Sequence, residues 1–115
     1  MSRGVVRLKR VYDPVCPDDG ARILVDRLWP RGISRERAAI DLWLKDIAPS
    51  PELRAWWHGE SGTFDEFAAR YRVELDDNPA VDELRTALSA HSVVTLVYAA
   101  RDTQMNHAVV LRDYL

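Results

Sequence analysis

The sequence predicts an α/β fold in which a small, largely parallel sheet is flanked by helices. Residues 93–100 are mostly β-branched and apolar, which is typical of a strand buried on both faces. Two further runs with strand character lie near the beginning of the chain, and segments with helical periodicity separate them from 93–100. The resulting order is strand, strand, helix, ambiguous segment, helices, strand, helix, and it fits an α/β sandwich.

The first two strands are predicted at residues 5–12 and 22–29. The first alternates apolar and basic side chains after Val6, and Asp13-Pro14 ends it. The second begins with a continuous apolar run, which indicates an internal strand, and it leads into the chain-breaking residues 30–32. Residues 41–47 fit a strand or a helical continuation, but the following Ala-Pro pair favours an extended path.

Helix starts are indicated wherever a polar side chain can accept a hydrogen bond from a free backbone N–H, or where proline occupies the first turn. They predict helices after Ser34 (residues 35–40), after Ser50, after Thr63, after Asn78, and from about Asn106 to the C-terminus. The clearest start is the capping box formed by Thr63 and Glu66. Behind it, residues 64, 67, 68, 71 and 75 form one apolar stripe.

Composition limits the classes of function. At 115 residues the chain is expected to form one domain, residues 1–115. The net charge of -2 argues against strong general nucleic-acid binding, although residues 1–40 hold nine Lys or Arg against five Asp or Glu. The single cysteine, Cys16, suits a reducing compartment. No signal region or membrane-spanning stretch is present, so a cytoplasmic protein is expected.

No standard catalytic or phosphate-binding motif occurs, and no cofactor or metal-ligand set is predicted. Polar residues gather instead at the ends of the predicted strands, where ligands bind in open α/β sheets. Those after the second strand are Asp26, Arg27 and Arg31, those after the last strand are Arg101, Asp102, Asn106 and His107, and further candidates are Lys45 and the Trp56-Trp57-His58 corner.

These residue types point to an anion site. Arginines beside the backbone N–H groups at the start of the last helix would hold an anion. His107 is the natural acid/base candidate, because its ordinary pKa lies near neutrality. We expect Asp26 and Asp102 to pair with the arginines in the empty protein, and a bound anion to compete for those pairs. The alternative is that Arg101 and Asp102 form a structural ion pair and that His107 only begins a helix.

The relative direction of the two strands decides whether the two groups of polar residues can form one site. If the strands at 22–29 and 93–100 are parallel neighbours, their carboxyl ends lie at the same edge of the sheet, and the two groups converge. If the strands are antiparallel, the groups lie apart and become surface ion pairs. Most of the tryptophans are expected in the core, although one or two beside the cleft could stack on a flat ligand.

Three blocks of the sequence carry a resemblance to a known family. They are Val25-Asp26-Arg27-Leu28-Trp29-Pro30-Arg31-Gly32, the stretch from Leu42 to Ser50, and the stretch from Thr95 to Asp102 with Asn106-His107-Ala108. The chain resembles the bacterial family of unknown function numbered 488, in its YeaO-like branch. The resemblance implies a compact cytoplasmic α/β domain without an assigned biochemical role.

Longer members of that wider family are similar to one another in a Cys-His-Arg turn after the last strand. The matching residues here are Asn106-His107-Ala108, so the histidine is present and the cysteine and arginine are not. This difference argues against a thiol-nucleophile mechanism.

The leading hypothesis is a small-molecule site for an anionic or partly aromatic ligand between the strands at 22–29 and 93–100. Arg27, Arg31 and Arg101 would hold the anion, and His107 would transfer a proton if the protein is an enzyme. A second hypothesis is a regulatory or nucleic-acid-binding module that uses the basic first 40 residues. A third is a protein-interaction domain. Steeply salt-dependent nucleic-acid binding would favour the second, and a ligand-dependent rise in melting temperature the first.

Overall fold

The chain folds around a sheet whose strands all run in the same direction. The computed structural model describes residues 4–59 and 62–115, and there the sheet has four strands in the order β1-β4-β2-β3. The strands are β1 (Val5–Arg10), β2 (Ala21–Leu24), β3 (Leu42–Trp43) and β4 (Val93–Tyr98). All three pairings are parallel. The predicted class, an α/β fold with a small parallel sheet, is confirmed.

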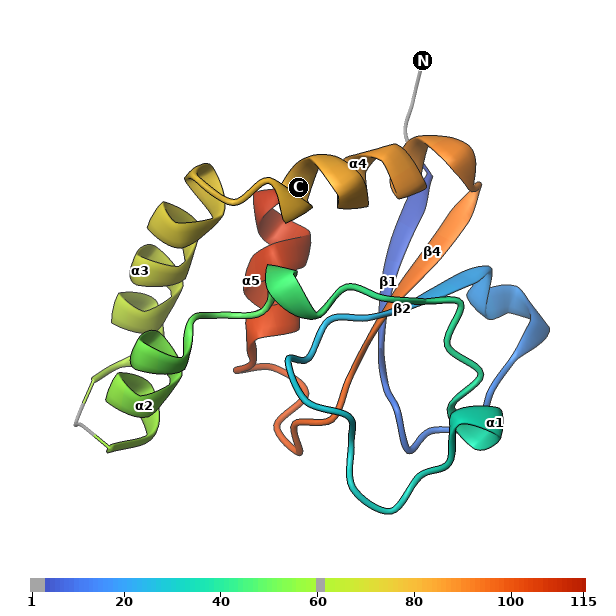
Figure 1. Ribbon diagram of the computed structural model, residues 1–115, viewed down its shortest axis with the longest axis horizontal. Coiled ribbons are helices and arrows are strands. Elements are labelled where there is room, and N and C mark those ends of the chain that lie inside the picture. Colours follow the sequence, from blue (N-terminus) through green and yellow to red (C-terminus); the bar gives the residue numbers. More distant parts are fainter. Residues whose placement is uncertain (1–3, 60–61) are drawn as a thin grey trace.

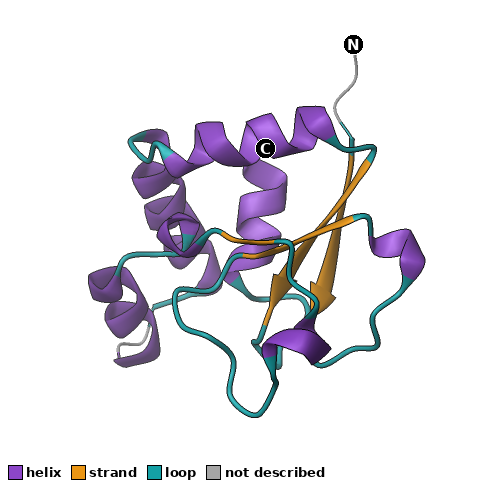
Figure 2. Cartoon of the chain, turned by 45° about the vertical axis from the view of Figure 1, so that its right-hand side comes forward, coloured by secondary structure: helices purple, strands orange, loops and turns teal. Residues whose placement is uncertain are grey.

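Helices and short turns connect the strands. In the described part of the chain the helices are α1 (Arg35–Ala38), α2 (Pro51–Gly59), α3 (Phe64–Asp76), α4 (Ala80–Ala90) and α5 (His107–Tyr114). Two 3-10 turns, η1 (Pro17–Asp19) and η2 (Lys45–Ile47), precede β2 and α2. Figure 1 shows α3, α4 and α5 together on one side of the strands, with α1 on the other side. Figure 2 shows the long loops that surround α1.

The last strand in the sequence lies inside the sheet. β4 pairs with β1 from Val5↔Val93 to Arg10↔Tyr98, and with β2 from Ala21↔Val94 to Leu24↔Val97. The strands predicted at 22–29 and 93–100 are therefore parallel neighbours. Their carboxyl ends meet at one edge of the sheet, which is the arrangement that brings the two groups of polar residues together.

Each face of the sheet packs on its own apolar cluster, because successive side chains of a strand point to opposite faces. Ile23, Leu96 and Tyr98 pack with residues of α2 to α5 in the larger cluster. Leu24 and Val97 pack with Ala38 of α1 in the smaller one. The sheet is covered on both faces, as parallel sheets normally are.

The second strand is shorter than predicted. β2 ends at Leu24, so the strand expected over 22–29 is wrong in its second half. Val25 N still donates to Val97 O at 3.0 Å. From Asp26 onward, hydrogen bonds that involve side chains take the place of backbone pairing between strands. The Trp43 indole donates to Asp26 O at 2.8 Å, and Ala99 N donates to the Asp26 carboxylate at 3.1 Å. Asp26, which follows β2, is thus fixed by hydrogen bonds although it is not part of a strand.

The predicted helix starts are confirmed. Ser34 Oγ accepts from Arg37 N at 3.1 Å, and Ser50 Oγ accepts from Leu53 N at 3.1 Å. Helix α1 ends two residues earlier than the predicted 35–40, because Ala39 has a left-handed φ of 51° and closes the helix. The ambiguous segment 41–47 follows an extended path into β3 and then turns in η2.

The capping box at the start of α3 provides a test of local stability. Thr63 Oγ1 accepts from Glu66 N at 3.1 Å, and Glu66 Oε1 accepts from Thr63 N at 3.3 Å. Thr63→Ala should lower the free energy of unfolding by roughly 1 kcal/mol in urea denaturation, since it removes a cap. Thr86→Ala is the control: Thr86 is an exposed threonine inside α4, where alanine is the better helix former. Equal stabilities of the two variants would contradict the prediction.

Candidate ligand-binding cleft

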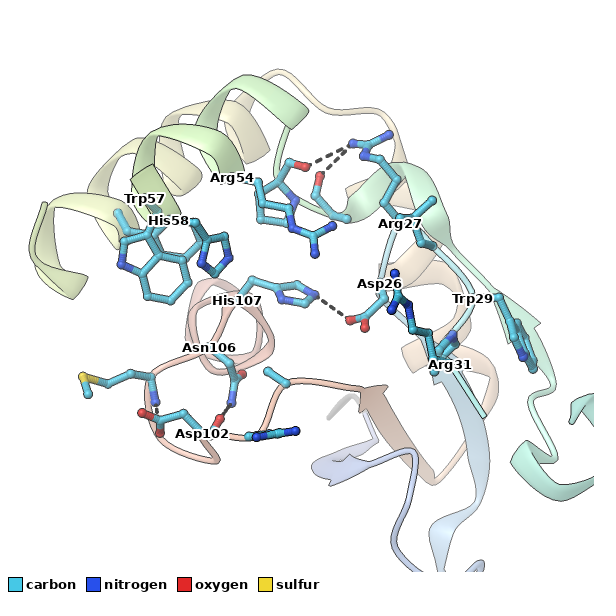
Figure 3. Close-up of a pocket in the computed structure, with 18 residues that line it drawn as sticks. Asp26, Arg27, Trp29, Arg31, Arg54, Trp57, His58, Asp102, Asn106 and His107 are labelled. Atoms are coloured by element: carbon cyan, nitrogen blue, oxygen red, sulfur yellow. Dashed lines mark hydrogen bonds and ion pairs between the residues drawn. The ribbon is translucent and has the colours of Figure 1, made fainter. Parts of the chain in front are cut away.

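A cleft of about 800 Å³ opens at the carboxyl ends of β2 and β4. Its walls come from the loop after β2, from helix α2 with the loop before it, from Phe67 of α3, and from the turn between β4 and α5 (Figure 3). Seven of the eight predicted site residues line it, namely Asp26, Arg27, Arg31, Arg101, Asp102, Asn106 and His107. The chain path thus brings the two polar groups into one concave surface.

Of the further candidates, Trp57 and His58 line the cleft, whereas Trp56 and Lys45 do not. The ammonium nitrogen of Lys45 lies 5.4 Å from the centroid of the Trp43 ring. The residue begins the η2 turn, where its side chain is exposed. A lysine stem covering an aromatic ring is an ordinary surface arrangement.

Asp26 pairs with a histidine in place of an arginine, so the expected Asp26–arginine pair is wrong. His107 Nε2 lies 3.2 Å from Asp26 Oδ1 and 3.0 Å from Val25 O. Because a carbonyl oxygen only accepts, Nε2 must carry a hydrogen, and that hydrogen is directed at Val25. Asp26 Oδ1 is buried and accepts no hydrogen bond from the described residues. The His107 ring thus lies beside this oxygen without donating a hydrogen bond to it.

Asp102 does not pair with an arginine either. Its Oδ1 accepts hydrogen bonds from Met105 N and Gln104 N, both at 2.9 Å, and these two bonds lower the pKa of the carboxyl group below its ordinary value. The expected Asp102–arginine pair is wrong because the turn after β4 uses this carboxylate to satisfy its own backbone.

Asn106 fixes the same turn to helix α5. It is buried, its Nδ2 donates to Asp102 O at 2.7 Å, and its Oδ1 accepts from Val109 N at 3.0 Å. Asn106 is therefore the N-cap of α5, and it sets the position from which His107 enters the cleft.

Arg27 is held by the loop before α2. Its Nη2 donates to Ala48 O and Pro49 O, both at 3.2 Å, while its buried Nε has no partner among the described residues. Arg27 adds positive charge to the cleft, but its hydrogen bonds connect the loop after β2 to the loop before α2.

Three other arginines line the cleft, and their guanidinium groups have no partner in the part of the chain that the structure describes. Arg31, Arg54 and Arg101 are exposed, and within residues 4–59 and 62–115 none of their guanidinium groups makes an ion pair or a hydrogen bond. Figure 3 shows the side chains of Arg54 and Arg31 turned toward the centre of the cleft from opposite walls. This is the largest uncompensated charge in the cleft.

An aromatic wall, defined as Trp57, His58 and Phe67, closes the α2 side of the cleft. The rings of Trp57 and Phe67 stack at a centroid distance of 4.0 Å and an interplanar angle of 17°. Tyr71 continues the row toward His107, whose ring lies 6.3 Å away. Burial raises the pKa of Tyr71, whose hydroxyl donates to Ile47 O at 2.6 Å. The wall is thus anchored in the core.

Comparison with known proteins decides the family. A family model described as "Inactive DUF488-N3 subclade" matches residues 5–115. The chain belongs to the DUF488 family. The resemblance inferred from the three sequence blocks is confirmed. The uncharacterized protein Rv3073c of Mycobacterium tuberculosis is 51% identical over 110 residues, which are 96% of this chain and 92% of that protein. The uncharacterized protein YeaO of Escherichia coli is 44% identical over 110 residues, 96% of each chain. No solved structure matches.

In this DUF488 chain the three blocks that carry the resemblance meet at the cleft. The first supplies Asp26, Arg27 and Arg31, the second supplies the two carbonyl groups that hold Arg27, and the third supplies His107. Among the described residues of the DUF488 chain, no group of three or more His, Cys, Asp or Glu is placed to hold a metal ion. Its described helices include none long and apolar enough to cross a membrane.

The sequence reasoning missed Arg54 and Phe67 as cleft residues of this DUF488 chain. Arg54, Trp57 and His58 stand at positions i, i+3 and i+4 of α2, so they share one face of that helix. Once the Trp-His corner was a candidate, this spacing was the available signal for Arg54. Phe67 lies on the predicted core stripe of α3, and no pattern distinguishes a core residue that also borders a cleft.

Proposed function

We propose that the cleft binds a small molecule with an anionic group, and that the protein acts by binding it. The observation that carries this proposal is a set of three guanidinium groups on one concave surface, those of Arg31, Arg54 and Arg101, which have no partner in the described part of the chain. Crowded like charges are costly unless something negative lies among them. Arginine also offers a planar fork of donors that matches carboxylate and phosphate groups.

The charge balance of the cleft supports an anion. Four arginines and two aspartates line it, in a chain whose net charge is -2. Both aspartates are already engaged, Asp26 beside His107 and Asp102 with backbone N–H groups. The N-terminus of α5 opens into the same space through Asn106 and His107, and its dipole favours negative charge.

Binding without turnover is favoured over catalysis. The matched family model is described as inactive, and its match spans nearly the whole chain. The Asp26–His107 pair has the arrangement that orients an imidazole for proton transfer, and the acid/base role of His107 stays a prediction.

Titration of inorganic phosphate, sulfate and citrate by calorimetry tests the proposal. We expect at least one of these anions to bind, and Arg31→Gln and Arg54→Gln each to weaken that binding about tenfold or more. Such a loss matches the roughly 1.5–3 kcal/mol that a hydrogen bond to a charged group contributes. Affinity should also fall as ionic strength rises.

Arg72→Gln is the matched control for these variants. Arg72 is an exposed arginine on α3 that does not line the cleft, so its loss changes the net charge equally without touching the site. Anion binding that drops equally in all three variants would reflect general charge and would refute the site. Failure of all three anions to bind would refute the proposal as well.

A further inference from the structure

We propose that the ligand of this cleft carries a planar aromatic ring next to its anionic group, with the ring against the aromatic wall and the anion between Arg54 and Arg31. This inference rests on the proposed function and narrows its ligand class. It predicts that an aryl phosphate or aryl carboxylate binds where a bare oxyanion binds only weakly.

The size of the cleft indicates a ligand larger than a bare oxyanion. Its volume of about 800 Å³ lies in the range of roughly 300–1,000 Å³ that is usual for organic ligands and cofactors. A phosphate or sulfate ion held by two arginines would leave most of this space to water. A ligand that fills the cleft must therefore have a body as well as a charged group.

The apolar lining of the cleft indicates that the ligand has an apolar part. Trp57 is half-buried and borders the cleft, while Phe67, stacked against it, is only 1% exposed and fixes the plane of the indole ring. Met105 is 52% exposed and Leu28 is 66% exposed, and both line the same cleft. Exposed apolar side chains around a concave, cationic surface favour an apolar part in the ligand.

The spacing of Arg54 and Trp57 on α2 places a cationic group beside an aromatic ring. Arg54 and Trp57 project from one face of the helix, three residues apart, so a guanidinium group and an aromatic surface stand side by side. Figure 3 shows Trp57 and His58 on one side of the cleft, Asp26 and Arg31 on the other, and His107 between them. One molecule with a ring at the α2 end and an anion toward Arg31 would contact both regions. Aromatic rings prefer such stacked or edge contacts, and the ring contact adds to the charge interaction.

Calorimetry with 1-naphthyl phosphate, inorganic phosphate and 1-naphthol, at constant ionic strength, tests this inference. We expect naphthyl phosphate to bind at least tenfold more tightly than inorganic phosphate and more tightly than naphthol. Trp57→Leu should weaken naphthyl phosphate at least fivefold and leave phosphate unchanged, whereas Arg54→Gln should weaken both. Met105→Ser, at an exposed position, should weaken naphthyl phosphate alone, and it serves as the test if Trp57→Leu does not fold.

Trp56→Leu is the matched control, because this neighbouring tryptophan lies outside the cleft, 4.1 Å from the Arg70 guanidinium. It should leave both affinities unchanged. Equal affinities for naphthyl phosphate and inorganic phosphate would overturn the inference and leave the anion site standing. Naphthol binding as tightly as naphthyl phosphate would overturn it too, since the anion would contribute nothing. If neither naphthyl phosphate nor inorganic phosphate binds, both this inference and the proposed function fail.

Discussion

Replacing Asp19 with asparagine is expected to lower the free energy of unfolding by about 3–5 kcal/mol, the usual cost of breaking a buried ion pair from one side. Asp19 and Arg22 are 4% and 3% exposed, and Arg22 Nη1 lies 2.7 Å from Asp19 Oδ2. Lys9 Nζ lies 3.0 Å from the other carboxylate oxygen. Without the carboxylate, Arg22 keeps a buried charge whose remaining partner is Ala38 O, which accepts from its Nε and Nη2.

The pH dependence of stability provides a second measure of the same residue. Burial would raise the pKa of Asp19, but hydrogen bonds from the Cys16 backbone N–H and from the Lys9 and Arg22 side chains outweigh it, so the pKa lies below its ordinary value of 3.8. The stability that the ionised group contributes is therefore present above pH 3.8 and is lost as the pH falls through the lower pKa of the folded state.

Urea unfolding between pH 3 and 7 checks both expectations. Asp18→Asn is the control, because Asp18 is exposed and its carboxylate has no partner among the described residues. Asp19→Asn should be much less stable than Asp18→Asn at neutral pH, and the difference should shrink in acid. Two variants of equal stability at neutral pH would show that the buried pair is not what holds η1 to the sheet.

Gly20→Ala is expected to destabilise the fold by about 2–5 kcal/mol, from a strained backbone and a steric clash together. Gly20 has a φ of +64°, and a Cβ placed there would lie 2.2 Å from Val93 O, the backbone of the strand next to β2. The two central strands would have to separate where β2 begins.

Gly32→Ala separates the two causes. Gly32 also has a positive φ, +76°, but no atom lies within 4 Å of an added Cβ. It should therefore show only the backbone strain, about 1–2 kcal/mol. Thermal and urea unfolding of both variants measure the difference, which is the clash with β4. A Gly32→Ala variant as unstable as Gly20→Ala would mean that the clash is relieved at no cost.

Local signals made the helices predictable. Caps and prolines act within one turn, so Ser34, Ser50 and Thr63 marked helix starts without any knowledge of the fold. The apolar stripe of α3 was equally legible, because Phe67 and Tyr71 become buried on the side that its period defines. The alternation of strands and helical segments predicted a largely parallel sheet, but the pairing of the second and last strands was a condition that only the structure could decide.

Contacts between distant segments were less predictable. β2 ends early because Trp43, on a strand predicted only as one of two options, donates its indole N–H to Asp26 O. Asp26 meets His107 because the register of β2 and β4 brings them together, and no sequence spacing encodes that register. The sequence could place both aspartates near the arginines, but the partner of each carboxylate depends on the turn geometry after β4.

The interior position of β4 has a consequence for how the protein is made. β1 and β2 are not neighbours, and each pairs with residues 93–98, which leave the ribosome long after both. Among the described residues β4 is the one strand that pairs with β1, so β1 stays unpaired during synthesis until β4 emerges. Until then the cleft also lacks the turn between β4 and α5, with His107. Pairings this distant in sequence slow folding and leave apolar strands exposed while they wait. The sheet of the nascent chain therefore cannot be completed until the last quarter of the sequence has been synthesised.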